Sequence, residues 1–512
     1  MAMNSRRSNT LRHNRWRLLS SAIAALCICS LSPNKVVAQQ STFKREAWLQ
    51  DYSTLKHALE RSYSNLAWFA SPQSGIDLPA LNRRTLAALH HAKSDEEAQS
   101  AVLAFVGGFH DGHFSQLASL APATGSKTKD PAPFQYDRQK PEAGCAALGY
   151  AAIGRTDFSL PFESLPGFTL TADGHDHPFR AGILMTDGHV QIGIVRIYSF
   201  RAESYFAVCL NAWKRAVWDE HGQLKTSDLR SDIDKEWYRA LAEVLKQFDA
   251  AKVNAVLVDI GNNSGGNDSG DMAARLFSAM PMHSAKLRMS QDTVASKAYF
   301  DEEVAALTRA QSYHPDAEGQ RLIDEAVKSL STEQAKLASP CPMEWVWKRR
   351  EDWQGNGCKR LVDVGSAGGP LDYLKPGVID DVQIAKRLHW PAEYVQLWGT
   401  WTGPTYVLTN NRTYSAAEMF AAVMQNNHAA RIIGAQTGGD GCGFIDGPEP
   451  VALPNSRLRF RIPNCVRMRA DGTDEVAGIK PDLPVLPEDN ESARSQAHRL
   501  AQTIETDLQP AH

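Results

Sequence analysis

The sequence lacks several features that would point to particular functions. It contains no low-complexity tract and no clear internal repeat, and its cysteines match no zinc-ligand spacing. No basic stripe offsets its 58 acidic residues. These absences disfavour a disordered or repeat protein, a zinc site and, most clearly, a nucleic-acid partner.

What is present is an ordinary globular composition. Hydrophobic residues make up 43% of the chain, so a sizeable core is available. The 512 residues are more than one hydrophobic core usually fills. We therefore expect two to four domains or subdomains.

The first 38 residues are typical of a secretory signal peptide. Residues 1–17 carry five arginines and no acid, an apolar run follows at 18–31, and small residues precede the expected cleavage after Ala38. A membrane anchor is the alternative, but the apolar run is short for a span. We expect a periplasmic or secreted protein without stable membrane insertion. Cleavage would leave 49 basic and 58 acidic residues, a formal charge of −9.

Six cysteines remain after cleavage, and an even number in an exported protein suggests disulfides. Two local pairs and one remaining pair form our hypothesis: Cys341 with Cys358, Cys442 with Cys465, and Cys145 with Cys209. Other connectivities stay open at this point.

The chain before residue 191 divides into two predicted regions. Residues 39–115 are predicted to be helical, with a capping box at Ser94–Glu97, and they end in a histidine-containing glycine turn. Residues 116–190, rich in proline and short apolar runs, are predicted to be loops, a few strands and a linker.

From residue 191 onward, strands alternate with helices, which indicates an α/β core around a mainly parallel sheet. We assign residues 191–285 and 395–487 to this core. The predicted strands are 192–197, 255–260, 406–409 and 431–434, and the predicted helices begin at 231–234, 272 and 416. A hairpin is predicted from 457–462 and 466–469, and a C-terminal helix within 488–512.

Residues 286–394 interrupt the alternation. They contain a polar helix at 317–337, the Cys341/Cys358 loop and a tryptophan-rich stretch. We interpret them as an insertion that packs over the core or its cleft as a lid. A separate accessory domain is the alternative.

A serine at a strand-to-helix junction is the first candidate for chemistry. Ser415 lies in T-Y-S-A-A-E, after an apolar run and at the start of a predicted helix. Helix N-termini stabilise negative charge that develops on a nucleophilic hydroxyl or its substrate. A helix N-cap is the simpler interpretation of this segment alone.

Three further segments contain candidate partners. D-I-G-N-N-S-G-G at 259–266 could supply an oxyanion-hole N–H from Gly265 or Gly266, together with that of Ala416, although a tight turn is the alternative. F-H-D-G-H-F at 109–114 offers a base at His113. E-V-A-G-I-K-P-D offers an acid at Glu475.

In their order along the chain and in their residues, these four segments resemble motifs of the tail-specific and C-terminal-processing serine peptidase superfamily. The resemblance covers residues 190–285 and 395–487 and the upstream D-G-H, and it includes I-I-G-x-x-T-G-G before the last motif. It implies a crotonase-like α/β peptidase core. It does not extend to a peptide-binding PDZ domain, whose carboxylate-binding glycine pattern is not found in residues 116–190.

The resemblance implies a Ser-His-Glu site of the tricorn-core-like branch. Ser415 matches the nucleophile, His113 the base and Glu475 the acid. The Ser–Lys branch has a lysine 25 residues after the serine, where this sequence has Asp440. The tricorn-like branch has a serine before the histidine, where this sequence has Gly112.

The expected reaction is acyl transfer to Ser415 with His113 as general base, and it needs no metal or organic cofactor. The expected partner is a peptide or an unfolded protein. A binding protein on the same fold without catalysis is the main alternative, favoured by Asp440 and Gly112. An esterase with the same nucleophile is a third possibility.

Overall fold

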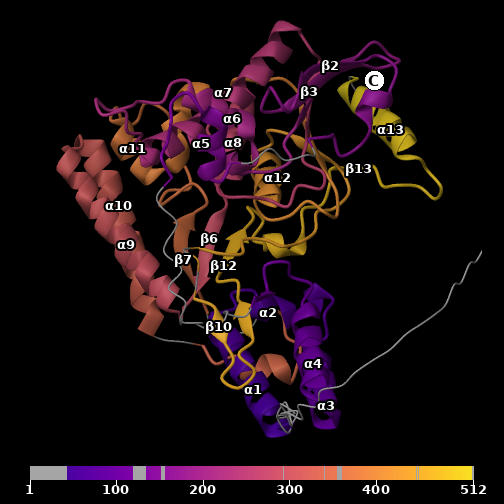
Figure 1. Ribbon diagram of the computed structural model, residues 1–512, viewed down its shortest axis with the longest axis vertical. Helices are drawn as coiled ribbons and strands as arrows, with labels where there is room; N and C mark the ends of the chain where they lie inside the picture. Colours follow the sequence, from indigo (N-terminus) through magenta and orange to yellow (C-terminus); the bar gives the residue numbers. More distant parts are fainter. Residues whose placement is uncertain are drawn as a thin grey trace, which may run out of the picture. The chain divides into compact units, whose positions relative to one another are not determined.

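The computed structural model has a mixed α/β fold, shown in Figure 1. It describes residues 43–118, 134–150, 156–291, 293–338, 341–353, 360–445, 447 and 449–509. From Lys44 onward the chain forms one compact unit. The predicted signal peptide lies outside the described residues, and in the described part no helix is long and apolar enough to cross a membrane.

A seven-stranded sheet forms the centre of the molecule. Its strand order is β13-β9-β8-β5-β4-β3-β2. These strands are β2 (Phe168–Asp173), β3 (Arg180–Met185), β4 (Gln191–Arg196), β5 (Ala255–Asp259), β8 (Thr405–Thr409), β9 (Arg431–Gly434) and β13 (Leu483–Pro484). The neighbours from β4 to β13 are parallel, whereas β2 and β3 are antiparallel additions. The four predicted strands are present.

Successive side chains of a strand point to opposite faces of the sheet, so the buried strands contribute to an apolar core on each face. Val256 and Val258 of β5 pack with the helices of one face, and Leu257 packs with α13 (Ala493–Leu508) on the other. The helices of the first face are α6 (Phe206–Trp213), α7 (Thr226–Ala250), α8 (Ser269–Ala274) and α12 (Ala416–Asn426) (Figure 1).

Helix α7 shows why the predicted helix start was wrong. The apolar stripe was identified correctly, and its members are buried: Ile233, Trp237, Leu241, Leu245 and Phe248. However, the helix begins at Thr226, so the predicted cap at Ser231–Asp234 lies inside it. An acidic residue in the exposed face of a long helix can look like a cap in sequence.

Two smaller, three-stranded sheets lie outside the central sheet. One has the order β1-β11-β10, from β1 (Ser115–Leu117), β10 (Val451–Ala452) and β11 (Arg459–Arg461). The other has the order β12-β6-β7, from β6 (Lys286–Ser290), β7 (Leu361–Ser366) and β12 (Cys465–Met468). The predicted hairpin is therefore wrong, because β11 and β12 belong to different sheets. Pro463 between them, which has no N–H to donate, breaks the pairing.

The predicted linker and insertion are both joined to these sheets. Strands β2 and β3, within 116–190, extend the central sheet. In the insertion, β6 pairs with β12, and a separate apolar core includes α9 (Val294–Ala310), α10 (Ala317–Gln334) and α11 (Val382–Leu388). The predicted polar helix is α10. The domain boundaries and the lid stay predictions.

The N-terminal region is helical, as expected. It contains α1 (Arg45–Ser62), α2 (Leu66–Phe69), α3 (Leu78–His91) and α4 (Asp95–Gly107). Ser94 caps α4 by accepting a hydrogen bond from the N–H of Glu97, as predicted. Aromatic rings then pack between α4 and the turn that carries His113, including Phe109 against Phe114.

Two of the three predicted disulfides are present. Cys145 of α5 (Pro141–Ala147) is bonded to Cys209 of α6, and Cys442 is bonded to Cys465 of β12. Cys358 lies outside the described residues, so the Cys341/Cys358 pair stays a prediction.

Candidate active site

The site lies where the loops after β5, β8 and β9 meet. Because these strands are parallel, their carboxyl ends share one edge of the sheet, which is where open α/β sheets bind ligands. Ser415 precedes α12 with φ 56° and ψ −120°, a conformation that non-glycine residues rarely adopt. Such local strain at a strand-to-helix turn exposes a serine hydroxyl.

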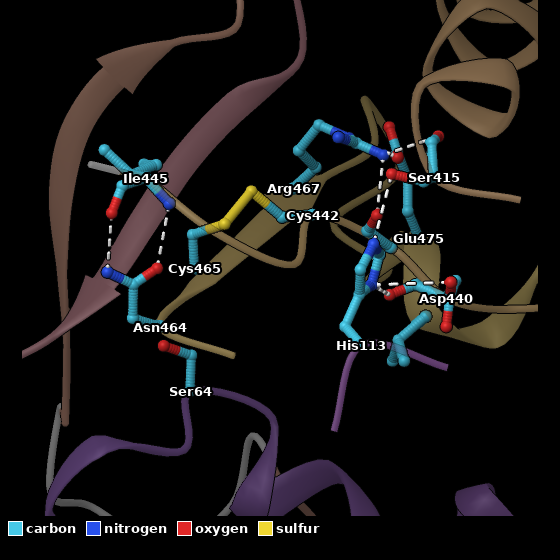
Figure 2. Close-up of a disulfide and its surroundings, with 12 residues drawn as sticks. Ser64, His113, Ser415, Asp440, Cys442, Ile445, Asn464, Cys465, Arg467 and Glu475 are labelled. Carbon is cyan, nitrogen blue, oxygen red and sulfur yellow. Dashed lines mark hydrogen bonds and ion pairs between the residues drawn. A yellow bond between two sulfur atoms is a disulfide. The ribbon is translucent and has the colours of Figure 1, made fainter. Parts of the chain in front are cut away.

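His113 lies in hydrogen-bonding contact with this serine. Its Nε2 is 3.2 Å from Ser415 Oγ, although the two residues are 302 positions apart in the chain (Figure 2). Gly443 has its backbone against the imidazole ring, where an added Cβ would lie 2.7 Å from a ring carbon. Phe444 packs edge-on against the same ring, with 5.6 Å between ring centroids. These contacts fix the ring plane.

Asp440 contacts the other nitrogen of this histidine. The Asp440 main-chain oxygen is 3.1 Å from His113 Nδ1, and its Oδ2 is 3.5 Å from the same atom. With Nδ1 as the donor to this carbonyl, Nε2 is left as the acceptor that a base requires. Asp440, which the sequence analysis counted against catalysis, therefore orients the imidazole.

The two departures from the family pattern contact each other. The N–H of Gly112 donates to Asp440 Oδ1 at 2.8 Å, across 328 positions of the chain. A Cβ at residue 112 would lie 3.0 and 3.1 Å from the two Asp440 carboxylate oxygens. A serine at 112 would therefore crowd Asp440, so Gly112 leaves room for the Asp440 carboxylate.

Glu475 does not occupy the predicted position beside His113. It is fully buried in the short 3₁₀ turn η9 (Glu475–Ala477), and its Oε2 accepts from Arg467 Nε at 2.5 Å. Arg467 Nη2 then donates to the carbonyl oxygens of Ser415 and Gly441, each at 2.8 Å (Figure 2). Burial of the Glu475 carboxylate requires a neighbouring cation, which Arg467 supplies. Among the described residues, Glu475 therefore contacts the serine turn only through Arg467.

The predicted oxyanion donors also need a correction. The N–H of Gly265 donates to Asn263 Oδ1 at 2.7 Å, so it is already used. Gly265 instead provides space, since a Cβ there, at φ +96°, would lie 2.6 Å from Ser415 Cβ. Within the described residues, the N–H groups of Gly266 and Ala416 have no hydrogen-bond acceptor. They are the two donors that stay available.

Glu418 is a residue of the site that the sequence analysis did not single out. This fully buried carboxylate accepts from the N–H of Ser415, at 3.0 Å. It also accepts from Thr437 Oγ1 and from the N–H groups of Gly439, Asp440 and Gly441. Burial raises the pKa of Glu418 to about 7. The capping-box spacing from Ser415 was the available signal, but a capping box does not reveal bonds to a distant loop.

A second buried acid, Asp111, supports the histidine turn. Its Oδ2 accepts from the Tyr63 hydroxyl at 2.5 Å, and its Oδ1 accepts from the N–H of His113 at 2.8 Å. Burial, and then the charge of Asp440, raise the pKa of Asp111 to about 7. Burial also lowers the pKa of His113, which the nearby Asp440 partly opposes. A lowered pKa keeps the imidazole neutral, and therefore able to accept a proton, in mildly acidic solution.

The comparison with known families decides the identity. The model of peptidase family S41 matches residues 191–485. The chain belongs to peptidase family S41. It is a serine-type peptidase, and the resemblance to the tail-specific peptidase superfamily is confirmed.

Solved structures support the fold of this S41 peptidase. Mature CPAF in complex with lactacystin aligns over 91% of this chain and 99% of its own, with 15% identity and a TM-score of 0.55. Mature CPAF alone aligns over 90% and 98%, with 15% identity and a TM-score of 0.54. No curated protein matches the sequence. The family assignment implies that the substrates are peptides or proteins.

The S41 site has one group of side chains that could hold a metal ion. Asp111, His113 and Asp440 place potential ligand atoms within 4.8 Å of one another, the one such group among the described residues. Both ring nitrogens of His113, however, are engaged by Ser415 and Asp440.

Dialysis of the S41 peptidase against EDTA is therefore expected to leave labelling by a fluorophosphonate probe unchanged. A loss that added Zn²⁺ or Mg²⁺ restores would contradict this expectation.

Substitution of Asp440 by asparagine is expected to shift the pH dependence. The negative charge of Asp440 favours the protonated imidazole, so its removal should lower the pKa of His113 further. Because the base acts when neutral, the acidic limb of the kcat/KM profile should move to lower pH. Loss of imidazolium stabilisation should also reduce kcat by about ten- to a hundredfold.

The matched control for Asp440→Asn is Asp187→Asn, an exposed acid paired with His498 far along the chain. Asp187→Asn should change neither the acidic limb of the kcat/KM profile nor kcat. The measurement is kcat/KM from pH 4 to 8 for the three proteins. An unmoved limb in Asp440→Asn would show that the carbonyl alone orients His113.

Proposed function

We propose that this S41 peptidase is exported and cleaves peptide bonds through an acyl-enzyme on Ser415, with His113 as general base. The observation that carries the proposal is the 3.2 Å contact between His113 Nε2 and Ser415 Oγ, with Nδ1 held by Asp440. This is the arrangement of an activated nucleophile, its base and an orienting group.

In the proposed reaction, Ser415 Oγ attacks the peptide carbonyl while His113 Nε2 takes the hydroxyl proton. The N–H groups of Gly266 and Ala416 bind the oxyanion; loss of one such donor typically costs about 10²–10³ in rate. His113 then gives its proton to the leaving amine, the C–N bond breaks, and an ester to Ser415 remains. Water, deprotonated by His113, hydrolyses this ester and restores the serine.

A cavity beside the oxyanion loop supports a substrate-binding role for the insertion. It has a volume of about 730 Å³ and begins at Asn267 and Asp268, directly after the oxyanion glycines. Its other walls come from α7 and from the insertion, including Tyr313 and Trp390. We propose that residues 286–394 hold part of the substrate and act as a lid.

Labelling of the purified mature protein with a fluorophosphonate probe tests the proposed mechanism. Wild type should be labelled, Ser415→Ala should not, and His113→Ala should be labelled slowly because its serine lacks a base. If folded wild type resists the probe and cleaves no peptide, a binding protein on the same fold becomes the better account. Rapid cleavage of esters without cleavage of peptides would favour the esterase alternative.

Export is a separate proposal with its own test. It is supported by the arginine-rich, then apolar, N-terminal sequence and by the two disulfides. Mass spectrometry of the protein from fractionated cells should find a mature N-terminus at residue 39, outside the cytoplasm. An uncleaved chain in the cytoplasmic fraction would contradict export and leave the catalytic proposal standing.

A further inference from the structure

A second cavity, of about 730 Å³, is lined by segments that are distant from one another in the sequence. They include residues 64–68 around the start of α2, strands β6 and β7, the end of α12, and the end of β12 with the turn that follows it. A volume of this size suits a small ligand or a few residues of a peptide. The proposed reaction at Ser415 does not use this cavity.

One buried amide in the wall of this cavity is unsatisfied. Asn65 is only 2% exposed, and its side-chain Nδ2 and Oδ1 both lack a hydrogen-bond partner among the described residues. Buried polar groups are costly to leave unpaired, so the great majority have a partner. The main chain of Asn65 is bonded in the ordinary way, since its carbonyl accepts from the N–H of Phe69. The side chain therefore provides an unused donor and an unused acceptor at the wall.

The apolar part of the wall consists of tryptophan and methionine side chains. The half-buried rings of Trp68 and Trp353 meet edge to face, with 5.7 Å between their centroids. The buried Met343 and Met468 line the same cavity. Tryptophan and methionine both pack favourably against a further aromatic ring. This part of the cavity therefore suits a flat, apolar group.

The charged side chains of the wall largely compensate one another. Three acid–base pairs line it: Arg288 with Asp363, Lys336 with Glu333, and His283 with Asp372. Arg360 and Arg469 donate to oxygen atoms of the protein, and Asp474 accepts from a main-chain N–H. Lys286 is exposed. Because a charge is costly to bury without a partner, this wall favours an uncharged ligand over an ion.

A peptide residue with an aromatic side chain matches these three features. Its main chain carries one N–H and one C=O, which the carbonyl and the NH₂ group of Asn65 can bond at the same time. Its ring can pack against Trp68 and Trp353. Main-chain hydrogen bonds combined with a side-chain pocket are a common way of binding an extended peptide.

The cavity shares two elements with the catalytic site. Ser415 directly precedes α12, and Asn426, the last residue of that helix, lines the cavity. Met468 follows Arg467, which bonds the Ser415 carbonyl. The 11 residues of α12 span about 16 Å at 1.5 Å per residue. A substrate segment that reaches the cavity must therefore lie at least about five extended residues from the cleaved bond.

We propose that this cavity is a second substrate-binding site. It takes an aromatic residue and the adjoining main chain from a segment of the protein substrate that is at least about five residues from the cleaved bond. This inference rests on the proposed peptidase function and names a substrate class for it, unfolded chains with an aromatic residue away from the cut. Because a segment held there raises the local concentration of the cleavage site at Ser415, it should lower KM and leave kcat unchanged.

Direct binding tests the site without catalysis. The probe is the capped tripeptide acetyl-Gly-(para-fluorophenylalanine)-Gly-amide, titrated with mature Ser415→Ala protein and followed by fluorine NMR. In this background Asn65→Leu should weaken binding about tenfold, through the loss of two hydrogen bonds, and Trp68→Ala by a similar factor. Trp218→Ala, which removes a half-buried tryptophan outside the cavity wall, is the matched control and should bind as before. Unchanged affinity in both cavity variants would overturn the proposal.

The melting temperature separates recognition from a structural role of Asn65. Leucine removes both unsatisfied amide atoms, so Asn65→Leu should melt at or above the temperature of the parent protein. A lower melting temperature would show that the amide serves the fold, and it would contradict the assignment of Asn65 to ligand binding.

Tethered substrates test the role in cleavage. A defined mixture of synthetic peptides is digested with the full mature protein, and cut sites are mapped by mass spectrometry. The best-cleaved peptide is then extended, at each end in turn, by a Gly/Ser spacer of about ten residues, with an r.m.s. reach of about 17 Å, and by Gly-Phe-Gly or Gly-Ala-Gly. At one end, Phe should give a KM about tenfold lower than Ala at equal kcat. Asn65→Leu should abolish this difference, and Trp218→Ala should keep it.

The outcomes distinguish this inference from the proposed function. If the fluorophosphonate probe labels wild type but the Phe and Ala substrates have equal KM at both ends, the second site is wrong and the peptidase mechanism stands. If wild type resists the probe and cleaves no peptide, the peptidase mechanism fails, whereas weakened tripeptide binding in Asn65→Leu still supports a peptide site in this cavity.

Discussion

Replacement of Ser415 by alanine is expected to abolish fluorophosphonate labelling and to lower kcat on the order of 10⁶-fold, the loss typical of a removed nucleophile. The hydroxyl is the one group of Ser415 that contacts His113, whereas its N–H and carbonyl bond to Glu418 and Arg467. These main-chain bonds persist in alanine. The melting temperature should therefore change little, as differential scanning calorimetry can measure.

Ser492 provides the matched control for this substitution. It caps α13 by accepting from the N–H of Ser495, and no histidine contacts it among the described residues. Ser492→Ala should cost about 1 kcal/mol of stability and leave labelling intact. If Ser415→Ala behaved in the same way, Ser415 would be an ordinary helix cap and the nucleophile would lie elsewhere.

Substitution of Glu475 by glutamine should have the largest effect on stability. It leaves the guanidinium of Arg467 buried without its counter-charge, which typically costs about 3–5 kcal/mol. Arg467 also holds the carbonyls of Ser415 and Gly441, so kcat should fall too. Urea unfolding gives the free energy of unfolding. The acidic limb of the kcat/KM profile should stay in place, because Glu475 does not contact His113.

The pH profile is the observation that separates two roles of Glu475. If an acid orients His113 directly, its replacement should shift the acidic limb of the kcat/KM profile, as we expect for Asp440. If the acidic limb moved in Glu475→Gln and not in Asp440→Asn, the assignment of Asp440 as the group that orients His113 would be wrong. In addition, Glu475→Gln with Arg467→Met should destabilise less than the sum of the single substitutions, since the pair is removed together.

The elements of the core could be predicted because their local patterns agree with their surroundings. The strand at 255–259 is apolar up to its last residue, Asp259, and is buried on both faces. Ser415 lies at a strand-to-helix junction that the local sequence indicates. A few strands were predicted within 116–190, but their membership of the central sheet was not, because β2 is an exposed edge strand with burial confined mostly to Ala172. Its pairing with β3 is set by the sheet and not by its own pattern.

The partners of the site residues were harder to predict, because they depend on contacts between distant segments. Asp440 and Gly112 were each noticed as departures, but the sequence did not show that the two residues contact each other. Glu475 was selected by its motif, whereas its ion pair with Arg467 depends on the bend of η9 back onto β12. A motif can identify a residue type and position without revealing the atom that the side chain meets.

The Cys442–Cys465 disulfide, whose formation from two thiols requires an oxidant, ties together two segments of this site (Figure 2). Cys442 precedes the glycine that lies against His113, and Cys465 stands on the strand that carries Arg467. The other links between the two segments are hydrogen bonds: the amide pairing of Asn464 with Ile445, and the donation from Arg467 to the Gly441 carbonyl. A chain whose cysteines stay reduced would therefore lack the covalent link between the loop that lies against His113 and the strand that carries Arg467.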